Sequence, residues 1–372
     1  MNFTFTDEQI QLRETLRRFL TQTYTLERRR AIGRAGGGCD PATWQHFAEL
    51  GILGLAIPES LGGIGGNSFD AMVVMEELGR SLVVEPYLST ALVGAGILVQ
   101  AGSAPQRQLL RAVAAGEVRL AFAHDERDAR WQLDAVATRA VPGTTGWILE
   151  GRKSIVRDGA GAHYLVVSAR TAGGISLFLL PGTTGRMTRS AVATHDGSSV
   201  AEIELAAVRV PQDALLGPEG GALPLIEAAS DVAIAGLCAE AVGAMDALLA
   251  LTLEYLKNRR QFGVPIGTFQ ALQHRMADML LHAELARSMS YLASAKLAVT
   301  DLMERRRAIS AAKFLVGRSA RFVGQEAVQL HGGMGVSDEV AASHYFKRLT
   351  LINASCGDMD HHLEQFGAAM SA

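Results

Sequence analysis

Apolar residues recur at helical spacing through the first third of the chain. Thr6 and Gln9 have the spacing of a capping box, and a stripe of Leu12, Leu16, Phe19 and Leu20 follows it. Further helices are predicted from Pro41 to Leu50 and from Ser68 to about Ser81. This first block, residues 1–118, is therefore expected to be helical.

A loop is predicted inside this block. Three consecutive arginines, Arg28–Arg30, precede three consecutive glycines, Gly36–Gly38, and both runs interrupt the apolar periodicity. The chain is expected to change direction there before the next helix.

The pattern changes at about residue 119, where the helical period gives way to short β-type runs. They are Arg119–Ala123, Ala135–Ala140, Trp147–Glu150, Tyr164–Ala169, Ser176–Leu180 and Val200–Val208. Turn signals such as Pro142-Gly143 and Asp196-Gly197 separate them, and no helical stretch intervenes. Residues 119–218 are therefore predicted to form a small antiparallel barrel or sandwich.

The last block, residues 219–372, is helical again and holds the longest amphipathic runs. Four helices are predicted: Pro224–Arg259, Thr268 to about Thr300, Arg307–Leu330, and Asp338 to the end. Four such helices predict a four-helix bundle. The fold class is thus α+β with three domains, 1–118, 119–218 and 219–372.

Composition excludes several classes of function. The 35 basic and 38 acidic residues leave a net charge of −3, which argues against a nucleic-acid partner and against a polybasic membrane anchor. Three widely spaced cysteines argue against a disulfide framework. The first residues lack a basic segment followed by an apolar core, and the apolar run Ala233–Leu253 carries Glu240 and Asp246. We expect a cytoplasmic protein without membrane insertion.

Five strings in order resemble motifs of the acyl-CoA dehydrogenase family over essentially the whole chain. They are Leu53-Gly54-Leu55-Ala56-Ile57-Pro58-Glu59, Glu76-Glu77-Leu78-Gly79, Tyr255-Leu256-Lys257-Asn258-Arg259-Arg260-Gln261-Phe262-Gly263, Phe269-Gln270 and Gln329-Leu330-His331-Gly332-Gly333-Met334-Gly335. The order of helical, β and helical blocks is also similar to this family. The resemblance implies the family's fold and an FAD-dependent oxidoreductase of fatty acid metabolism.

Some of these residues have a chemical interpretation of their own. The guanidinium of Arg259, at the end of a long helix, can form paired hydrogen bonds to a diphosphate, or can simply answer the helix dipole. The amide of Gln329 can donate and accept, while Gly332 and Gly333 permit close backbone approach or a helix cap.

The resemblance adds a cofactor to this interpretation. It implies that Arg259, Phe262, Gln270, Gln329, Gly332 and Gly333 reach an FAD held mainly by a neighbouring subunit. It therefore implies an oligomer, whether of identical or of different chains.

The family removes hydrogen from Cα and Cβ of an acyl-CoA, using a carboxylate as base and flavin as hydride acceptor. Both positions where members carry that base are changed here. By the resemblance, the position in the last helices is Gly357 and the position on the first long bundle helix is Ala233. Asp231 and Asp358 lie nearby as substitutes, although a residue one or two positions away faces a different direction. No family base is intact.

The segment that matches the family's flavin-binding T-E-P-x-A-G-S-D string is also altered. It reads Asp125-Glu126-Arg127-Asp128-Ala129-Arg130-Trp131-Gln132, which places a carboxylate at the threonine position and an indole at the serine position. Farther on, Ser154-Ile155-Val156 stands for the family's W-I-T and lacks its indole and hydroxyl. We expect this chain's own flavin pocket to be impaired.

Three functions fit this combination. The first is a small subunit, similar to the pimeloyl-CoA dehydrogenase type, that completes the site of a homologous large subunit. The second is a self-sufficient homotetramer with an unusual base, and the third is a non-catalytic assembly subunit. By the resemblance, the expected partners are an acyl-CoA substrate and an electron-accepting flavoprotein.

A metal site at Asp358-x-Asp360-His361-His362 is not expected. Adjacent residues of a helix point about 100° apart, so the two imidazoles and two carboxylates cannot share one compact site. An interface-facing or solvated helix is the better interpretation.

Overall fold

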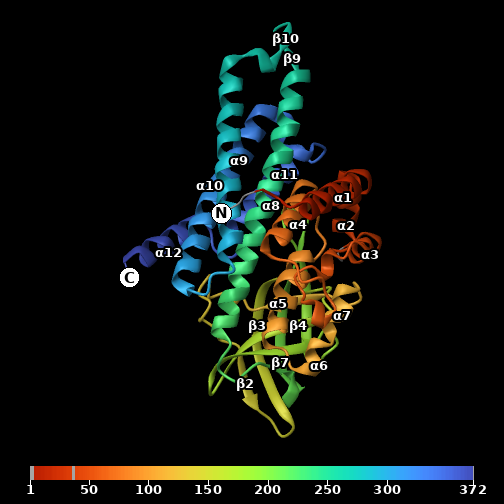
Figure 1. Cartoon of the computed structure of the whole chain (residues 1–372), viewed down its shortest axis with the longest axis vertical. Coiled ribbons are helices and arrows are strands. Elements are labelled where there is room, and N and C mark those ends of the chain that lie inside the picture. The colour runs from red at the N-terminus through yellow and green to blue at the C-terminus, as the bar shows by residue number, and fades with distance from the viewer. Residues whose placement is uncertain (1–3, 36–37, 372) are drawn as a thin grey trace. The chain divides into compact units, whose positions relative to one another are not determined.

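The computed structural model describes residues 4–35 and 38–371 (Figure 1). Contacts within the chain divide it into two units, each assembled from separate segments. Unit 1 comprises Met1–Arg29, Ser68–Val83 and Ile234–Ala372, and unit 2 comprises Arg30–Asn67 and Val84–Ala233. Unit 1 therefore joins the first helices to the last ones, whereas the three predicted domains follow the order of the sequence.

The first helix begins where the sequence predicts it. Helix α1 spans Asp7–Thr23, and the side chains of Thr6 and Gln9 satisfy each other's backbone amides as a capping box. The later helix α4, Ser68–Arg80, matches the predicted helix from residue 68.

The arginine run is helical, which corrects the predicted loop. Helix α2 spans Leu26–Arg34 and contains all three arginines. Arginine is a good helix former, and buried Arg29 donates from Nε to the carbonyl of Leu82 (2.8 Å), so tertiary contacts hold this segment. Gly36 and Gly37 lie outside the described residues.

Five helices follow the β region. They are α8 (Leu223–Asn258), α9 (Gln270–Lys296), α10 (Leu302–His331), α11 (Ala341–Ala354) and α12 (Met359–Ser371). A short hairpin of β9 (Arg260–Gln261) and β10 (Val264–Pro265) connects α8 to α9, and α9 lies beside α10 (Figure 1). Helix α10 begins five residues before the predicted start, because the side chain of Asp301 accepts from the amides of Met303 and Glu304.

The predicted fourth bundle helix is two helices. A turn at Cys356 and Gly357 separates α11 from α12, and both residues have left-handed φ values of 54° and 94°. Asp358 then accepts a hydrogen bond from the amide of His361 (2.9 Å) and starts α12. The region is thus a bundle of long helices with a break in the last one.

Helices α4 and α8 touch backbone to backbone within unit 1. An added Cβ on Gly79 would lie 2.0 Å from the carbonyl oxygen of Glu240, and one on Gly243 would lie 1.8 Å from that of Glu76. Both positions therefore require glycine. The carboxylate of Glu240 in turn pairs with Arg348 of α11 through two hydrogen bonds of 2.5 and 2.7 Å, and both groups are buried.

Unit 2 is built around a mixed sheet rather than a purely antiparallel one. Its strands are β1 (Leu120–Ala123), β2 (Arg139–Pro142), β3 (Gly146–Arg157), β4 (Tyr164–Thr171), β5 (Gly174–Pro181), β6 (Met187–Ala193), β7 (Ser199–Pro211) and β8 (Leu215–Leu216). The order is β6-β7-β3-β2-β4-β5-β8, and β1 pairs with β4. Strands β1 and β2 run parallel to β4, while the other pairs are antiparallel.

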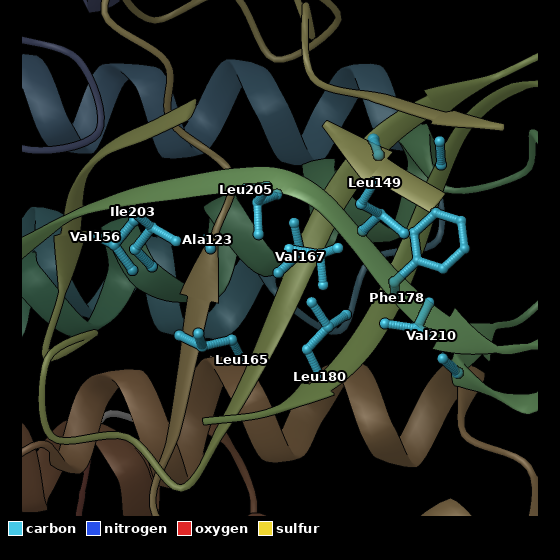
Figure 2. Packing of buried hydrophobic residues seen from close by; sticks show 14 of the residues in the cluster. Ala123, Leu149, Val156, Leu165, Val167, Phe178, Leu180, Ile203, Leu205 and Val210 are labelled. Atoms are coloured by element: carbon cyan, nitrogen blue, oxygen red, sulfur yellow. The ribbon is translucent and has the colours of Figure 1, made fainter. Parts of the chain in front are cut away.

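Alternating residues of these strands fill the core of unit 2. Figure 2 shows Leu149, Val167, Phe178, Leu180 and Leu205 pointing into one cluster, all with less than 2% of their surface exposed. Trp147 joins the cluster edge-on to Phe178, with ring centroids 5.5 Å apart. The alternation of inward and outward positions along β3 and β7 is what the sequence pattern predicts.

Short helices complete unit 2. They are α3 (Pro41–Glu49), the π-helix η3 (Leu88–Gly94), α5 (Ala95–Ala101), α6 (Ala104–Arg107) and α7 (Leu109–Ala114), with 3₁₀ turns at Ile52–Gly54, Glu59–Leu61 and Gln212–Ala214. All seven residues of the π-helix are buried.

Helix α8 is the one described helix that is long and apolar enough to cross a membrane. Most of its most apolar window is buried inside the protein, as in a core helix.

Candidate functional site

The end of α8 presents a cationic and an aromatic side chain. Arg259 follows the last residue of α8, and its amide donates to the carbonyl of Tyr255 (2.8 Å), so it is still tied to the helix. Phe262 lies at the turn of the β9–β10 hairpin with a φ of 52°, and its side chain is 91% exposed. It stands edge-on to Phe269, with ring centroids 6.1 Å apart. Both Arg259 and Phe262 are accessible to a ligand or a second chain.

The end of α10 presents an open stretch of backbone. Gly332 has φ 60° and ψ −139°, a conformation that glycine alone adopts without strain. A Cβ on Gly332 or Gly333 would meet no atom within 4 Å, so the space above both residues is free. Gln329, just before this turn, is exposed, and so is Gln270 at the start of α9.

The structure brings these six sequence-predicted residues to one end of the helices α8, α9 and α10 in unit 1. The ends of α8 and α10 are joined by the side chain of Tyr255, which stacks on His331. The hairpin leads directly from Arg259 to Gln270. The group has a guanidinium, two amides and an open glycine backbone, which suit the charge and hydrogen-bond acceptors of a dinucleotide diphosphate. We call it the bundle half-site.

Gly357 is held in the turn between α11 and α12. The fully buried ammonium of Lys313 donates to the carbonyls of Asn353 (2.9 Å) and Gly357 (2.7 Å). Burial lowers the pKa of Lys313. This lysine therefore fixes the carbonyl groups at the end of α11, a role that its position in the sequence does not reveal.

Two imidazoles fill the space beside Gly357. An added Cβ would lie 2.6 Å from Cδ2 of His361 and 2.7 Å from Nε2 of His362. Nε2 of His362 donates to the carbonyl of Cys356 (2.8 Å), and burial lowers the pKa of this histidine to about 4, so the ring is neutral near pH 7. A side chain at position 357 would have to displace these rings.

None of the three other candidate base positions, Asp358, Asp231 and Ala233, presents a free carboxylate. Asp358 accepts from the amide of His361 at the start of α12. Asp231 on α8 is buried and has a polar partner of its own. Position 233 is a half-buried alanine. Neither Gly357 nor Ala233 carries a carboxylate of its own.

The altered segment in unit 2 has a carboxylate and an indole at its surface. Asp125 is exposed, yet neighbouring protein atoms crowd its carboxyl, and this desolvation raises its pKa to about 6 against the effect of Lys153. Trp131 is also exposed. Between them in the sequence, Arg130, which the resemblance matches to a glycine, has a φ of 51°. The backbone thus keeps a glycine-like conformation without the glycine.

The three residues Ser154, Ile155 and Val156 differ in their exposure. Ser154 and Val156 are buried, and the hydroxyl of Ser154 donates to Glu202 (2.8 Å). Ile155 is 64% exposed and has a φ of 55°. Of the three, only Ile155 is exposed enough to lie against a ligand.

A buried polar network lies behind this surface, and the sequence alone does not predict it. The ammonium of Lys153 donates to Glu126 (2.7 Å), to Ser168 (2.8 Å) and to the carbonyl of His124 (3.1 Å). Burial lowers the pKa of Lys153 to about 8, and burial together with Lys153 lowers that of His124 to about 3. Glu126 also accepts from the amides of Ala137 and Thr138. The one local signal is a lysine at an inward position of a β-strand.

Comparisons with known proteins identify the fold and the family. The acyl-CoA dehydrogenase N-terminal domain model matches residues 6–117, and the C-terminal domain model matches residues 225–371. Acyl-CoA dehydrogenase IpdE2 of Mycobacterium tuberculosis (strain ATCC 25618 / H37Rv) is 32% identical over 349 residues, covering 92% of this chain and 91% of the relative. The chain belongs to the acyl-CoA dehydrogenase family.

Two of the solved structures that match bear the names of two different chains. A chain of a variant of the Tcur3481-Tcur3483 steroid ACAD matches with a TM-score of 0.88 and 31% identity, over 98% of both chains. A chain of the ChsE4-ChsE5 complex from Mycobacterium tuberculosis matches with a TM-score of 0.89 and 25% identity, over 100% of this chain and 99% of the other. The fold of this chain is thus shared with chains from two structures that are each named after two proteins.

Family membership makes the protein an oxidoreductase of the acyl-CoA dehydrogenase class, with FAD as cofactor. The donor set of the bundle half-site fits that cofactor. The segments around Asp125, Trp131 and Ile155 differ from the strings to which the resemblance matches them, and no carboxylate stands at Gly357 or Ala233, where the resemblance places the base.

Proposed function

We propose that this chain is the small subunit of a hetero-oligomeric, FAD-dependent acyl-CoA dehydrogenase, and that its bundle half-site binds an FAD held mainly by a homologous large subunit. The observation that carries the proposal is the contrast between two sets of residues. The half-site keeps Arg259, Gln329 and the open glycines, while the base positions are Gly357 and Ala233. Random decay would not separate the two sets in this way.

In this proposal each residue of the half-site has one task. Arg259 pairs with a diphosphate oxygen, Gln270 and Gln329 orient polar groups of the nucleotide, and Gly332 and Gly333 allow its close approach. Phe262 covers the site with an apolar ring. FAD, when bound, supplies the acceptor for the β-hydrogen of an acyl-CoA, and the base for the α-proton belongs to the partner. The physiological setting is cytoplasmic, with an electron-accepting flavoprotein downstream.

The alternative of a self-sufficient homotetramer needs Asp231 or Asp358 as base. Asp358 is engaged at the start of α12, and Asp231 is buried beside a polar partner. Neither carboxylate is presented as a base, which favours the hetero-oligomer. The third candidate, an assembly subunit without a catalytic part, differs from the proposal only in whether the half-site binds FAD.

The deciding measurement is flavin per chain, together with turnover. We expect this chain purified alone to lack flavin absorption, and the complex with a large subunit to hold fewer flavins than chains. Full flavin loading of the isolated chain, with turnover of any acyl-CoA, would contradict the proposal. A working complex whose FAD affinity is indifferent to Arg259→Ala would favour the assembly subunit instead.

A further inference from the structure

Tyr255 and His331 form the one described side-chain stack between the ends of α8 and α10. The two rings lie 4.5 Å apart at their centroids with an interplanar angle of 26°. The phenol oxygen of Tyr255 also donates to the carbonyl of His331 at 3.3 Å. A single tyrosine thus contacts both the ring and the backbone of the last residue of α10.

His331 is a fixed platform for this stack. It is buried, and its Nδ1 lies 2.8 Å from the carbonyl oxygen of Ala327. Because a carbonyl only accepts, Nδ1 carries the proton and the tautomer is determined. Burial lowers the pKa of His331, which keeps the ring neutral near pH 7.

The carbonyl that Tyr255 reaches has no partner within its own helix. The last four carbonyls of an α-helix lack intrahelical donors, and the carbonyl of His331 is the final one of α10. Gly335 helps to fold the following turn back over the helix end, since a Cβ there would lie 2.6 Å from the carbonyl oxygen of Val328 and 3.1 Å from Cβ of His331. The end of α10 is therefore shaped around this contact.

The residues of the bundle half-site at the ends of α8 and α10 adjoin Tyr255 and His331. Arg259 lies one helical turn after Tyr255, and its amide donates to the carbonyl of Tyr255. Gln329 lies two residues before His331, and Gly332 follows it directly. A shift between the ends of α8 and α10 would therefore separate the guanidinium from the amide and the glycines.

We infer that Tyr255 is a positioning residue of the half-site, which sets the spacing between Arg259 and Gln329–Gly333 for FAD. The inference rests on the proposed function, because it presupposes that the half-site binds FAD. Its new content is that flavin affinity depends on a tyrosine that acts through the two helix ends.

The test measures FAD affinity in the assembly that binds FAD, by fluorescence titration of the FAD-free form. Tyr255→Phe removes only the hydrogen bond, and Tyr255→Leu removes the stack as well. The matched control is Tyr345→Phe, which removes a similar phenol-to-carbonyl bond in unit 1, from Tyr345 to Arg80. Arg259→Ala is the reference for a direct contact, and Arg305→Ala is its control, since Arg305 donates to the carbonyl of Val299 away from the half-site. Thermal midpoints of all FAD-free variants are recorded.

We expect Tyr255→Phe to raise the Kd for FAD about 3- to 10-fold, the range of one lost hydrogen bond, and Tyr255→Leu to raise it at least about 10-fold. Tyr345→Phe should change the Kd for FAD less than about twofold, although it should lower the thermal midpoint about as much as Tyr255→Phe does. If Tyr255→Leu fails to assemble, Tyr255→Phe decides.

Two outcomes would overturn the inference, and they differ from each other. If Arg259→Ala weakens FAD binding while Tyr255→Phe does not, or Tyr345→Phe weakens it equally, the half-site stands and the positioning role is wrong. If Arg259→Ala has no more effect than Arg305→Ala, the half-site itself is wrong, and the positioning role falls with it.

Discussion

Several single residues hold backbone conformations that their side chains disfavour. Arg130 is exposed with a φ of 51°, and Cys356 and Ile155 have φ values of 54° and 55°. For a residue with a Cβ, the left-handed region costs about 1–2 kcal/mol. Arg130 and Ile155 lie in the two segments that the resemblance matches to flavin-binding strings, and Cys356 precedes Gly357. All three therefore adopt a backbone conformation that glycine would adopt without this cost.

Arg130→Gly is expected to stabilise the chain by up to about 1 kcal/mol, because relief of the left-handed strain outweighs the extra entropy of glycine in the unfolded state. Urea denaturation of the variant beside the unchanged chain measures the difference in the free energy of unfolding.

Arg127→Gly is the matched control for this prediction. Arg127 lies three residues before Arg130, is also exposed, and has no left-handed φ to relieve. Its substitution should therefore destabilise the chain by about 0.5–1 kcal/mol. Equal losses of stability for the two glycine substitutions would mean that Arg130 is not strained.

At the scale of elements, the sequence predicts what is local and misses what depends on distant partners. The capping box of α1 and the starts of α4 and α8 follow from neighbouring residues and agree with the structure. The break between α11 and α12 is not predicted because helical spacing continues across it, whereas Lys313, far back in the sequence, holds its carbonyls. Strands β6 and β8 are missed for a different reason. Strand β6 is mostly exposed and β8 has only two residues, so neither gives a long apolar run in the sequence.

The candidate site likewise contains residues that the sequence predicts and contacts that only the fold reveals. Arg259, Gln270 and Gln329 lie in contiguous strings, so the sequence alone could single them out. The stack of Tyr255 on His331 joins helix ends that are far apart along the chain, and only the fold brings them together. The same holds for the contact of Lys153 with Ser168, which joins two strands.

Gly357→Glu tests whether the turn between α11 and α12 can accept a base. We expect a loss of at least about 2 kcal/mol in the free energy of unfolding, because a left-handed residue gains a Cβ and the new side chain displaces His361 and His362. No acyl-CoA turnover should appear in the isolated chain, since its flavin surface is still altered.

Ala233→Glu is the matched variant, because position 233 lies in a regular helix without a left-handed φ. It should cost less stability and likewise give no turnover. Dehydrogenase activity from either isolated variant would show that only the base was missing.

At the scale of the whole molecule, a charge network joins four helices of unit 1. Glu77 of α4 pairs with Arg17 of α1 (2.5 Å), and Asp246 of α8 pairs with Arg80 (2.8 Å) and with Arg287 of α9 (2.7 Å). Glu76 lies among these groups, but its Oε1 is buried without a hydrogen-bond partner. Burial raises the pKa of Glu76 to about 7, with Arg287 opposing and Asp246 and Glu77 adding to the shift.

The contribution of Glu76 to stability should therefore fall as the pH rises from about 4.5 to about 7. The folded-state pKa of Glu76 is higher than its unfolded value of 4.5, so the unfolded chain releases this proton first and becomes more favourable relative to the fold. Glu76→Gln removes the ionisation, and its stability relative to the unchanged chain should rise by about 3 kcal/mol between pH 4.5 and pH 8. Denaturation midpoints at the two pH values measure this difference.

Glu77→Gln serves as the control, because it removes a neighbouring carboxylate that is paired with Arg17 and should destabilise the chain near neutral pH. A constant difference between Glu76→Gln and the unchanged chain at both pH values would show that Glu76 does not ionise in this range.

Unit 1 combines segments from both ends of the chain, and this affects the order in which the chain can fold during synthesis. Its first helices, α1 and α4, leave the ribosome early, but their partners α8 and α9 come from the last third of the chain. At about 5–20 residues per second, the roughly 200 residues between α4 and the end of α9 take about 10–40 seconds to synthesise. For most of that interval α1 and α4 lack the contacts that α8 and α9 supply, whereas nearly all of unit 2 emerges before α9 does. Translation therefore imposes an order on folding. The sheet of unit 2 can form before the bundle, and α1 and α4 can pack fully only after α8 and α9 are synthesised.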